Sequence, residues 1–270
     1  MGCVVMRSVV LGCAVMGGAA MRGAGLACAS VLLLLAAGPP APAQELRAPP
    51  RGALRPGIGP EDPRQPVDPA SAPWQSLLRV QTELGGRCTG TLIAPDKVLT
   101  AAHCLLARNR AQFVQPGSVH VLLGYHLGAW AAHGRVASYR LGPGFAAQPM
   151  GPAGADWAVL TLEAPLNQAA PLPLVRRIPQ SREAVTLGGY QQDRPEVILA
   201  HAACHITGRM RGEAASIVLL HDCAGTRGSS GAPVLVQLED RSWGVLGLAT
   251  ALASPGIGLA IPAMAIEAGP

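Results

Sequence analysis

The sequence predicts an all-β fold, and three features of its pattern support this prediction. Short runs of apolar or β-branched residues recur from Trp74 onward between Gly, Pro and Asp residues, as the strands of a β domain do. No long amphipathic helix lies between these runs, which argues against alternating strands and helices. A proline-rich stretch, residues 163–175, divides about twelve runs into two sets of about six, so two six-stranded barrels or a sandwich would fit.

The expected strands can be followed in order along the chain. The first set consists of SLLRVQT, TGTLIA, KVLTAA, SVHVLL, RVASYRL and WAVLTL. The second set consists of AVTLGGY, EVILAH, SIVLLH, APVLVQL, WGVLGLAT and IGLAIP. Each run has the length and the aliphatic or β-branched composition of one strand. We therefore expect the two barrels at about residues 73–165 and 172–265.

The composition narrows the classes of function. Apolar residues make up 49% of the chain but aromatic residues only 3%, so few rings are available to stack on bases or to form a membrane belt. The formal charge of +5 comes from scattered arginines, and Lys97 is the only lysine. We therefore expect no nucleic-acid partner.

The first 43 residues have the pattern of an export signal. Val31–Ala37 form an apolar core, and Ala41–Ala43 supply a small-x-small cleavage pattern that would leave Gln44 as the first residue. Translation from Met21 would give a more regular signal, and we hypothesise that start. An uncleaved anchor is the alternative, but the apolar run is short for a membrane span. We expect a secreted or periplasmic protein with no membrane span after cleavage.

Residues 44–72 are rich in Pro, Arg and Gly, as in APPRGALRPGIGPEDPRQP. Such a segment offers too little apolar surface to order itself, so we expect a leader or linker here. The folded domain is then expected at residues 73–270.

The cysteines agree with export. Three lie within the expected signal, and an even number remains in the mature chain, which suggests two disulfides: Cys88, Cys104, Cys204 and Cys223. Zinc binding is an alternative for these four, but none of them form a C-x-x-C pair. The histidines of the chain other than His103 show no metal-ligand spacing either, so we expect no metal.

Three short segments carry groups that suit acyl transfer. His103 ends VLTAAHC, and an imidazole can take and return a proton near neutral pH. Asp156 opens the strand DWAVLTL, where a carboxylate either caps a turn or orients a buried imidazole. Ser230 lies in TRGSSGAPV, but a serine hydroxyl needs a base and nearby oxyanion donors to react.

The glycines around Ser230 suit an oxyanion hole. Gly228 and Gly231 allow backbone conformations that a Cβ forbids, so that the amides of Gly228 and Ser230 can point at one oxygen. Ser229 is expected to be a spacer between them. A G-x-S-x-G elbow of the α/β-hydrolase type is excluded, because Ala232 stands where its second glycine would be.

The three segments together resemble the chymotrypsin/trypsin family of serine peptidases. TAAHC is followed by DWAVL, with 53 residues from His103 to Asp156, and then by G-x-S-G-x-P, with 74 residues from Asp156 to Ser230. The resemblance spans residues 73 to about 262. It implies two orthogonal six-stranded barrels with the active site in the cleft between them. It also implies a protein or peptide substrate, no cofactor and a monomer.

The family's mechanism can be carried onto the matching residues. On this resemblance Ser230 is the nucleophile, His103 the general base and then acid, and Asp156 the residue that holds the histidine tautomer. Cys88 and Cys104 match the family's disulfide around the histidine loop, and Cys204 with Cys223 would form the second bridge. A catalytically inactive binding module with the same fold is the alternative function.

Two departures from the family pattern set further expectations. Ser229 stands where animal members have an activation Asp, and no I-V-G-G sequence precedes the domain, so the chain looks more like bacterial members. We expect the oxyanion hole to be preformed or held by another contact. The expected specificity pocket contains neither an acid nor a histidine, which favours a small or medium apolar side chain: Ala224, Ala249, Thr250 and Ala251.

Overall fold

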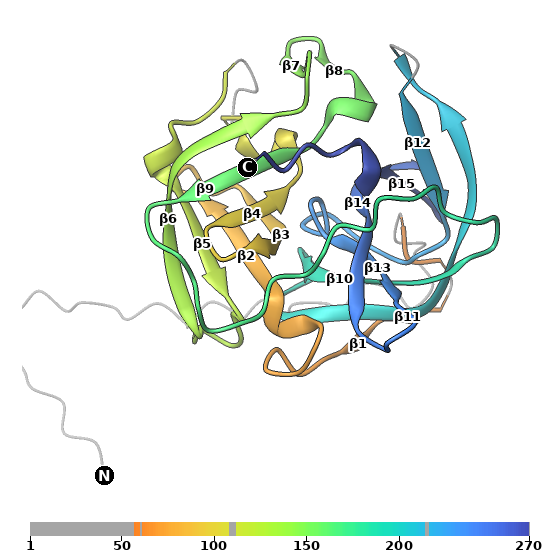
Figure 1. Ribbon diagram of the computed structural model, residues 1–270, viewed down its shortest axis with the longest axis horizontal. Helices are drawn as coiled ribbons and strands as arrows, with labels where there is room; N and C mark the ends of the chain where they lie inside the picture. Colours follow the sequence, from red (N-terminus) through yellow and green to blue (C-terminus); the bar gives the residue numbers. More distant parts are fainter. Residues whose placement is uncertain (1–56, 60, 108–111, 214–215, 270) are drawn as a thin grey trace, which may run out of the picture. The chain divides into compact units, whose positions relative to one another are not determined.

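The computed structural model describes residues 57–59, 61–107, 112–213 and 216–269 (Figure 1). The expected signal peptide, the hypothesised start at Met21 and the first part of the expected leader lie outside the described residues. Among the residues described, no helix has the length and apolar character needed to span a membrane.

The first barrel is a closed ring of six antiparallel strands. The order around the ring is β2-β3-β4-β9-β6-β5, and consecutive strands pair throughout. Its core is aliphatic, as the composition predicts, with Leu78, Val98 and Leu160 fully buried. The strands are β2 (Leu77–Thr82), β3 (Arg87–Ala94), β4 (Lys97–Thr100), β5 (Val119–Leu123), β6 (Ala132–Leu141) and β9 (Ala158–Leu162).

The second barrel is also antiparallel and closes through one long strand. β11 pairs with β10 along its first part and with β12 along its last residues, so β11-β10-β13-β14-β15-β12 forms a ring. The strands are β10 (Ala184–Gln191), β11 (Arg194–Arg211), β12 (Ile217–His221), β13 (Pro233–Gln237), β14 (Trp243–Ser254) and β15 (Ile257–Pro262). The prediction of an all-β fold with two six-stranded barrels is confirmed. Figure 1 shows the first ring in orange to green and the second in cyan to blue.

Short elements lie at the ends of these strands. Single turns of 3-10 helix precede or follow strands, where the chain changes direction. They are η1 (Trp74–Ser76), η2 (Ala102–Leu105), η3 (Pro116–Ser118), η4 (Ala153–Ala155) and η6 (Ala263–Ala265). Three further strands have two residues each: β1 (Gln65–Pro66), β7 (Ala146–Ala147) and β8 (Met150–Gly151).

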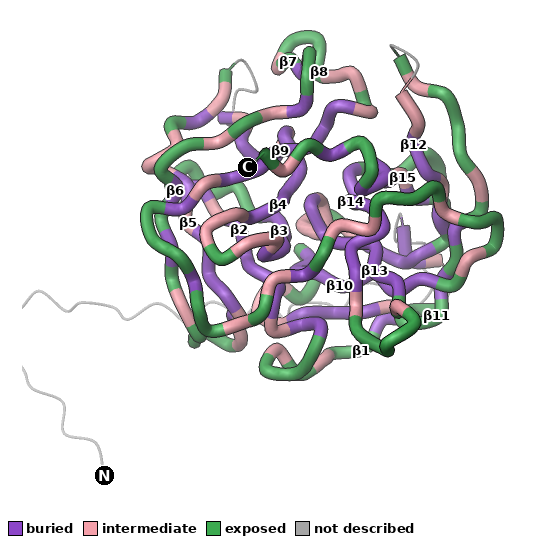
Figure 2. Tube along the Cα trace, in the orientation of Figure 1, coloured by how far each residue is buried: buried purple, intermediate pink, exposed green. Residues whose placement is uncertain are grey.

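An apolar layer joins the two barrels. One buried cluster contains Leu99 and Trp157 from the first barrel together with Ile198 and Leu235 from the second. Figure 2 shows the buried stretches of both sets of strands in purple, with exposed loops in green. Burying an aliphatic side chain of this size stabilises the fold by about 1.5–3 kcal/mol. The barrels are therefore held to each other by a shared core, which fixes the residues at their boundary.

The domain begins earlier than expected. β1 pairs with β11, where Gln65 lies opposite Ala200, and the amide of Val67 donates to the carbonyl of Ile198 at 3.2 Å. Described residues between Gly57 and Val67 therefore contact the second barrel, although the sequence predicts a leader or linker through residue 72. The arginine in this segment, Arg64, can be buried with no exposed side-chain surface because two carboxylates pair with its charge.

Candidate active site

His103 lies in η2, directly after β4 of the first barrel. Ala101 and Ala102 are fully buried and fix the chain, while the His103 side chain is 23% exposed. Its Nδ1 lies 2.7 Å from Oδ2 of Asp156, and its backbone amide donates to Oδ1 at 2.9 Å. Both carboxylate oxygens therefore hold one residue. With Nδ1–H directed at the carboxylate, a neutral ring has its lone pair on Nε2.

Asp156 caps η4 and precedes β9, which pairs with β4. Its side chain is 10% exposed, so its hydrogen bonds to His103 form with little competition from water. The sequence left open whether this carboxylate caps a turn or orients an imidazole. In the structure it lies at the end of η4 and contacts the imidazole.

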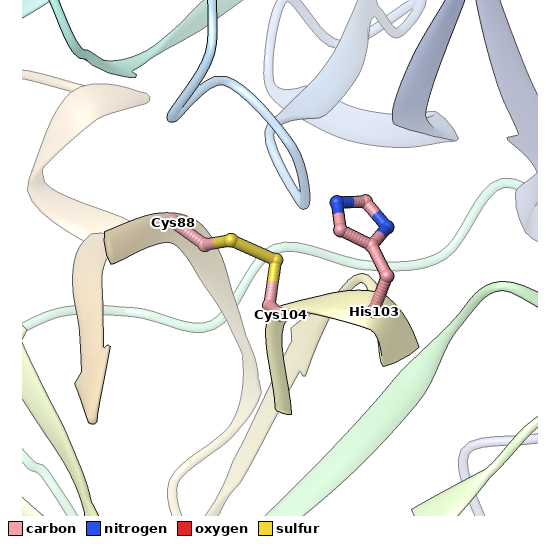
Figure 3. A group of neighbouring side chains, drawn as sticks. All are labelled: Cys88, His103 and Cys104. Carbon is pink, nitrogen blue, oxygen red and sulfur yellow. A yellow bond between two sulfur atoms is a disulfide. The ribbon is translucent and has the colours of Figure 1, made fainter. Parts of the chain in front are cut away.

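A disulfide joins η2, the turn that carries His103, to β3. Cys88 at the start of β3 is bonded to Cys104 of η2, beside His103 (Figure 3). A ring nitrogen of His103 lies within 4.8 Å of both sulfurs, but sulfurs bonded to each other offer no thiolate to a metal. Cys204 and Cys223 are bonded likewise. The pairs in the structure are those that the resemblance implies.

Ser230 lies in a tight turn of the second barrel that needs both neighbouring glycines. Gly228 has φ +94° and Gly231 φ +80°, in the left-handed region. A Cβ on Gly228 would lie 2.8 Å from the carbonyl oxygen of Tyr190, and one on Gly231 would lie 2.2 Å from that of Thr89. The amide of Thr89 also donates to the carbonyl of Ser230 at 2.9 Å, which joins this turn to the first barrel.

The amides of Gly228 and Ser230 remain available in this turn. Within the described ranges neither donates a hydrogen bond to a protein acceptor, whereas Ser229 and Gly231 donate to Thr226 and Ala249. Two free amides in one glycine-containing turn are what an oxyanion hole requires.

The structure does not place the Ser230 hydroxyl on His103. Oγ of Ser230 donates to the carbonyl of Thr250 at 3.5 Å, and no hydrogen bond between Ser230 and His103 occurs among the described residues. The Thr250 hydroxyl makes no hydrogen bond to Asp156 there either. Contacts between nucleophile and base are often formed only when substrate binds.

The three residues nevertheless face one cleft between the barrels. A cavity of about 460 Å³ is lined by His103 and Asp156 from the first barrel and by Gly228 and Ser230 from the second. This cleft lies where the sequence analysis expects the active site.

A second cavity, of about 210 Å³, adjoins Ser230 within the second barrel. Three residues of the expected specificity pocket line it: Ala249, Thr250 and Ala251. Ala224 is not among the lining residues; it is buried, and its amide donates to Nδ1 of His201 at 3.0 Å. Leu187, His221 and Cys223 contribute lining that the sequence analysis did not identify.

His221 is the lining residue with the most distinctive chemistry. It is 2% exposed, its Nδ1 accepts a hydrogen bond from the Cys223 amide at 3.2 Å, and its ring packs on Gly258, where a Cβ would lie 2.1 Å from Cε1. Burial lowers the pKa of His221 to about 4, so the ring is neutral at pH 7 and Nε2 carries the proton. Nε2 is buried and has no partner in the described part of the chain.

A sequence signal for His221 exists but is weak. The side chain follows Leu219 by two residues in SIVLLH, and both are buried, as strand alternation requires. Its proximity to Gly258 depends on the register of β12 and β15, which pairs these two residues.

Comparisons with known proteins agree with this geometry. A family model described as a trypsin-like peptidase domain matches residues 88–248. Among solved structures, that of a Glu endopeptidase in complex with MPD is similar, with a TM-score of 0.62 at 21% identity. The similarity covers 74% of this chain and 90% of that one, and at this identity it supports the fold alone.

Proposed function

Because the chain belongs to the family of trypsin-like peptidase domains, we propose that it is a serine endopeptidase whose nucleophile is Ser230. The observation that carries the proposal is the two-point contact between His103 and Asp156 in the same cleft as Ser230. Such a pair presents Nε2 as a base while the carboxylate stabilises the imidazolium that forms.

The proposed reaction begins with a turn of the Ser230 side chain. Oγ leaves the carbonyl of Thr250, gives its proton to Nε2 of His103 and attacks the carbonyl carbon of the substrate. The amides of Gly228 and Ser230 stabilise the oxyanion. His103 then protonates the leaving amine, and a water deprotonated by His103 hydrolyses the acyl-enzyme.

A fluorophosphonate probe tests this proposal against an inactive binding module. The proposal expects one adduct per molecule of mature protein, located on Ser230 by mass spectrometry. Ser230→Ala should remove the label, whereas Ser181→Ala, at an exposed serine of the same barrel, should keep it. A folded wild-type protein that takes no label, or a label that survives Ser230→Ala, would contradict the proposed peptidase activity.

The lining of the second cavity suggests which substrate side chain is preferred just before the cleaved bond. Nε2–H of His221 needs an acceptor, and Arg227 adds a cation to the lining. The described lining contains no Asp or Glu. A carboxylate side chain is an acceptor only, so it matches this set of donors better than the apolar side chain expected from sequence. The name of the similar Glu endopeptidase agrees with a glutamate at this position.

Peptides that differ only at this residue test the preference. We expect kcat/KM to follow the order Glu, Gln, Leu, with Glu at least about tenfold above Leu, because a buried hydrogen bond to a charged group contributes about 1.5–3 kcal/mol. His221→Leu should abolish the order while still reacting with the fluorophosphonate. A wild-type preference for Leu or Ala would restore the apolar interpretation.

We further propose that the protein is secreted or periplasmic, with residues 1–43 removed as a signal. The two disulfides support an oxidising compartment. Mass spectrometry of the precursor tests the start at Met21, because peptides from residues 1–20 would exclude it. An N-terminus at Gln44 in the exported protein would support the cleavage site.

A further inference from the structure

Arg64 holds a buried network that no catalytic role explains. Its side chain has no exposed surface. Nε and Nη2 donate to the two carboxylate oxygens of Asp62, each at 2.8 Å, and Nη1 and Nη2 donate to those of Asp193 at 3.1 and 2.6 Å. Nη1 also donates to Oε1 of Gln191 at 2.5 Å. A buried guanidinium with this many acceptors fixes the position of each of them.

The carboxylates in this network are held ionised. Hydrogen bonding from Arg64 lowers the pKa of Asp62. Burial acts to raise the pKa of Asp193, but hydrogen bonds from Arg64 and Thr226 together hold it below its ordinary value. Charge-assisted hydrogen bonds therefore join the segment upstream of β1, which carries Asp62 and Arg64, to the hairpin between β10 and β11.

The network continues into the turn that carries the nucleophile. The Thr226 amide donates to Oε1 of Gln191 at 2.8 Å, and its hydroxyl donates to Oδ1 of Asp193 at 3.0 Å. The carbonyl of Thr226 in turn accepts from the amide and the hydroxyl of Ser229 at 3.1 and 2.7 Å. Ser229 lies between Gly228 and Ser230, whose amides form the proposed oxyanion hole.

The upstream segment makes a second contact with the same turn. The amide of Gly225 donates to the carbonyl of Gly57 at 2.8 Å. Gly57 has φ +90°, and a Cβ there would lie 2.1 Å from the Gly225 carbonyl oxygen, so the two backbones are in direct contact. Ile58 is only 7% exposed beside this contact. Within the described ranges 57–59 and 61–66, Gly57 thus contacts Gly225 directly, and Arg64 reaches the neighbouring Thr226 through Gln191 and Asp193.

We propose that Arg64 is a positioning residue that holds the turn at residues 225–230 in the conformation of a formed oxyanion hole. The upstream segment, described at residues 57–59 and 61–66, is then a permanent part of the catalytic domain and not a leader to be discarded. It supplies from upstream a cation that animal members of the family supply through a newly released ammonium. Ser229 needs no charge in this arrangement, because Gln191 and Asp193 bond to Thr226 and not to Ser229. This inference rests on the proposed peptidase activity.

Kinetics of Arg64 variants in the full mature protein test the proposal. Arg64→Gln should lower kcat on the order of 100-fold with KM little changed, since losing an oxyanion donor costs about that much. Arg64→Lys should recover part of this loss, because an ammonium keeps the charge but not the paired geometry. Arg194→Gln, at an exposed arginine of the same hairpin, should keep wild-type kcat.

A peptide boronate separates positioning from general stability. Its tetrahedral adduct places an oxygen in the oxyanion hole, so its affinity should fall in Arg64→Gln in parallel with kcat, while a substrate-like peptide that cannot react binds as before. Unchanged kcat and unchanged boronate affinity in a folded Arg64→Gln protein would overturn the inference. A wild type that reacts with neither substrate nor fluorophosphonate would defeat the peptidase proposal instead.

A second variant covers the case in which Arg64→Gln does not fold. Thr226→Val leaves Arg64 and both carboxylates in place but removes the hydroxyl that joins Asp193 to the turn. We expect about a tenfold loss of kcat with KM unchanged, from the loss of a hydrogen bond to a charged group. A kcat equal to that of the wild type would contradict the proposed connection. N-terminal sequencing adds a direct check, since an active enzyme that lacks Arg64 would also overturn it.

Discussion

The two halves of the site are held in different ways. The half contributed by the first barrel, His103 and Asp156, is fixed by contacts beside the residues themselves: two hydrogen bonds and an adjacent disulfide. The half contributed by the second barrel, the turn around Ser230, is linked through Asp193 and Thr226 to Arg64, more than 150 residues upstream. The proposed base is therefore organised locally, whereas the proposed nucleophile and its oxyanion hole are organised from a distance, and in the described part of the chain Ser230 makes no hydrogen bond to His103.

The largest expected effect breaks the local half. Asp156→Asn replaces an acceptor that takes two hydrogen bonds from His103 with an amide, which favours the wrong tautomer. We expect kcat to fall on the order of 10⁴-fold with the fold retained. Asp240→Asn, at an exposed residue, is the matched control, and both are measured by steady-state hydrolysis of a peptide ester. A loss below about tenfold would show that this pair does not organise the base.

The two disulfides allow the halves to be compared at equal cost in stability. They close loops of similar length, with 16 and 19 residues of separation, so removing either by double Ala substitution should lower the free energy of unfolding by about 3 kcal/mol. Only the Cys88–Cys104 variant should lower kcat, because that bridge supports η2. The Cys204–Cys223 variant should change the preference for the residue before the cleaved bond. Urea unfolding and peptide kinetics measure both, and identical kinetic profiles would contradict the comparison.

The second barrel also contains an acid-sensitive group. Burial lowers the pKa of His221 to about 4, against 6.5 in the unfolded chain, so the unfolded chain binds the proton more tightly. The stability that neutral His221 preserves is complete above pH 6.5 and is lost as pH falls toward 4, by about 3 kcal/mol at most. The carboxylate of Asp222 opposes this shift in the pKa of His221. Burial also lowers the pKa of His201, so this second histidine adds a pH dependence of stability with the same sign.

His221→Leu should therefore flatten the dependence of stability on pH between 6.5 and 4. Urea unfolding at several pH values measures the slope. If the wild type and the variant lose stability in parallel over this range, His221 does not titrate as its burial requires.

The smallest expected effect concerns the joint between the halves. Thr89 of the first barrel donates through Oγ1 to the Gly228 carbonyl at 2.9 Å and accepts from the Tyr190 amide at 2.9 Å. Thr89→Val leaves both groups without this partner and should destabilise the protein by about 1–3 kcal/mol, with a modest loss of kcat. Thr89→Ser keeps the hydroxyl and should stay near the wild type in urea unfolding. Equal losses in the two variants would assign the effect to the methyl group and not to the hydrogen bonds.

The difference between the halves also explains what the sequence could predict. The strands follow from short apolar runs, and His103, Asp156 and Ser230 stand in local motifs, so local patterns sufficed for them. The composition around Arg64 predicts a linker, because an arginine is usually solvated and its partner Asp193 lies 129 residues away. Local patterns do not predict the place of His221 in the pocket, because its approach depends on the pairing of β12 with β15.

A crystal structure with a peptide boronate would test most directly whether the two halves join at Ser230. We expect Oγ of Ser230 to have left the Thr250 carbonyl and to be bonded to boron. One boron-bound oxygen should lie within hydrogen-bonding distance of the Gly228 and Ser230 amides, with Nε2 of His103 facing the adduct. A boronate bound elsewhere, or Ser230 still directed at Thr250, would contradict the account.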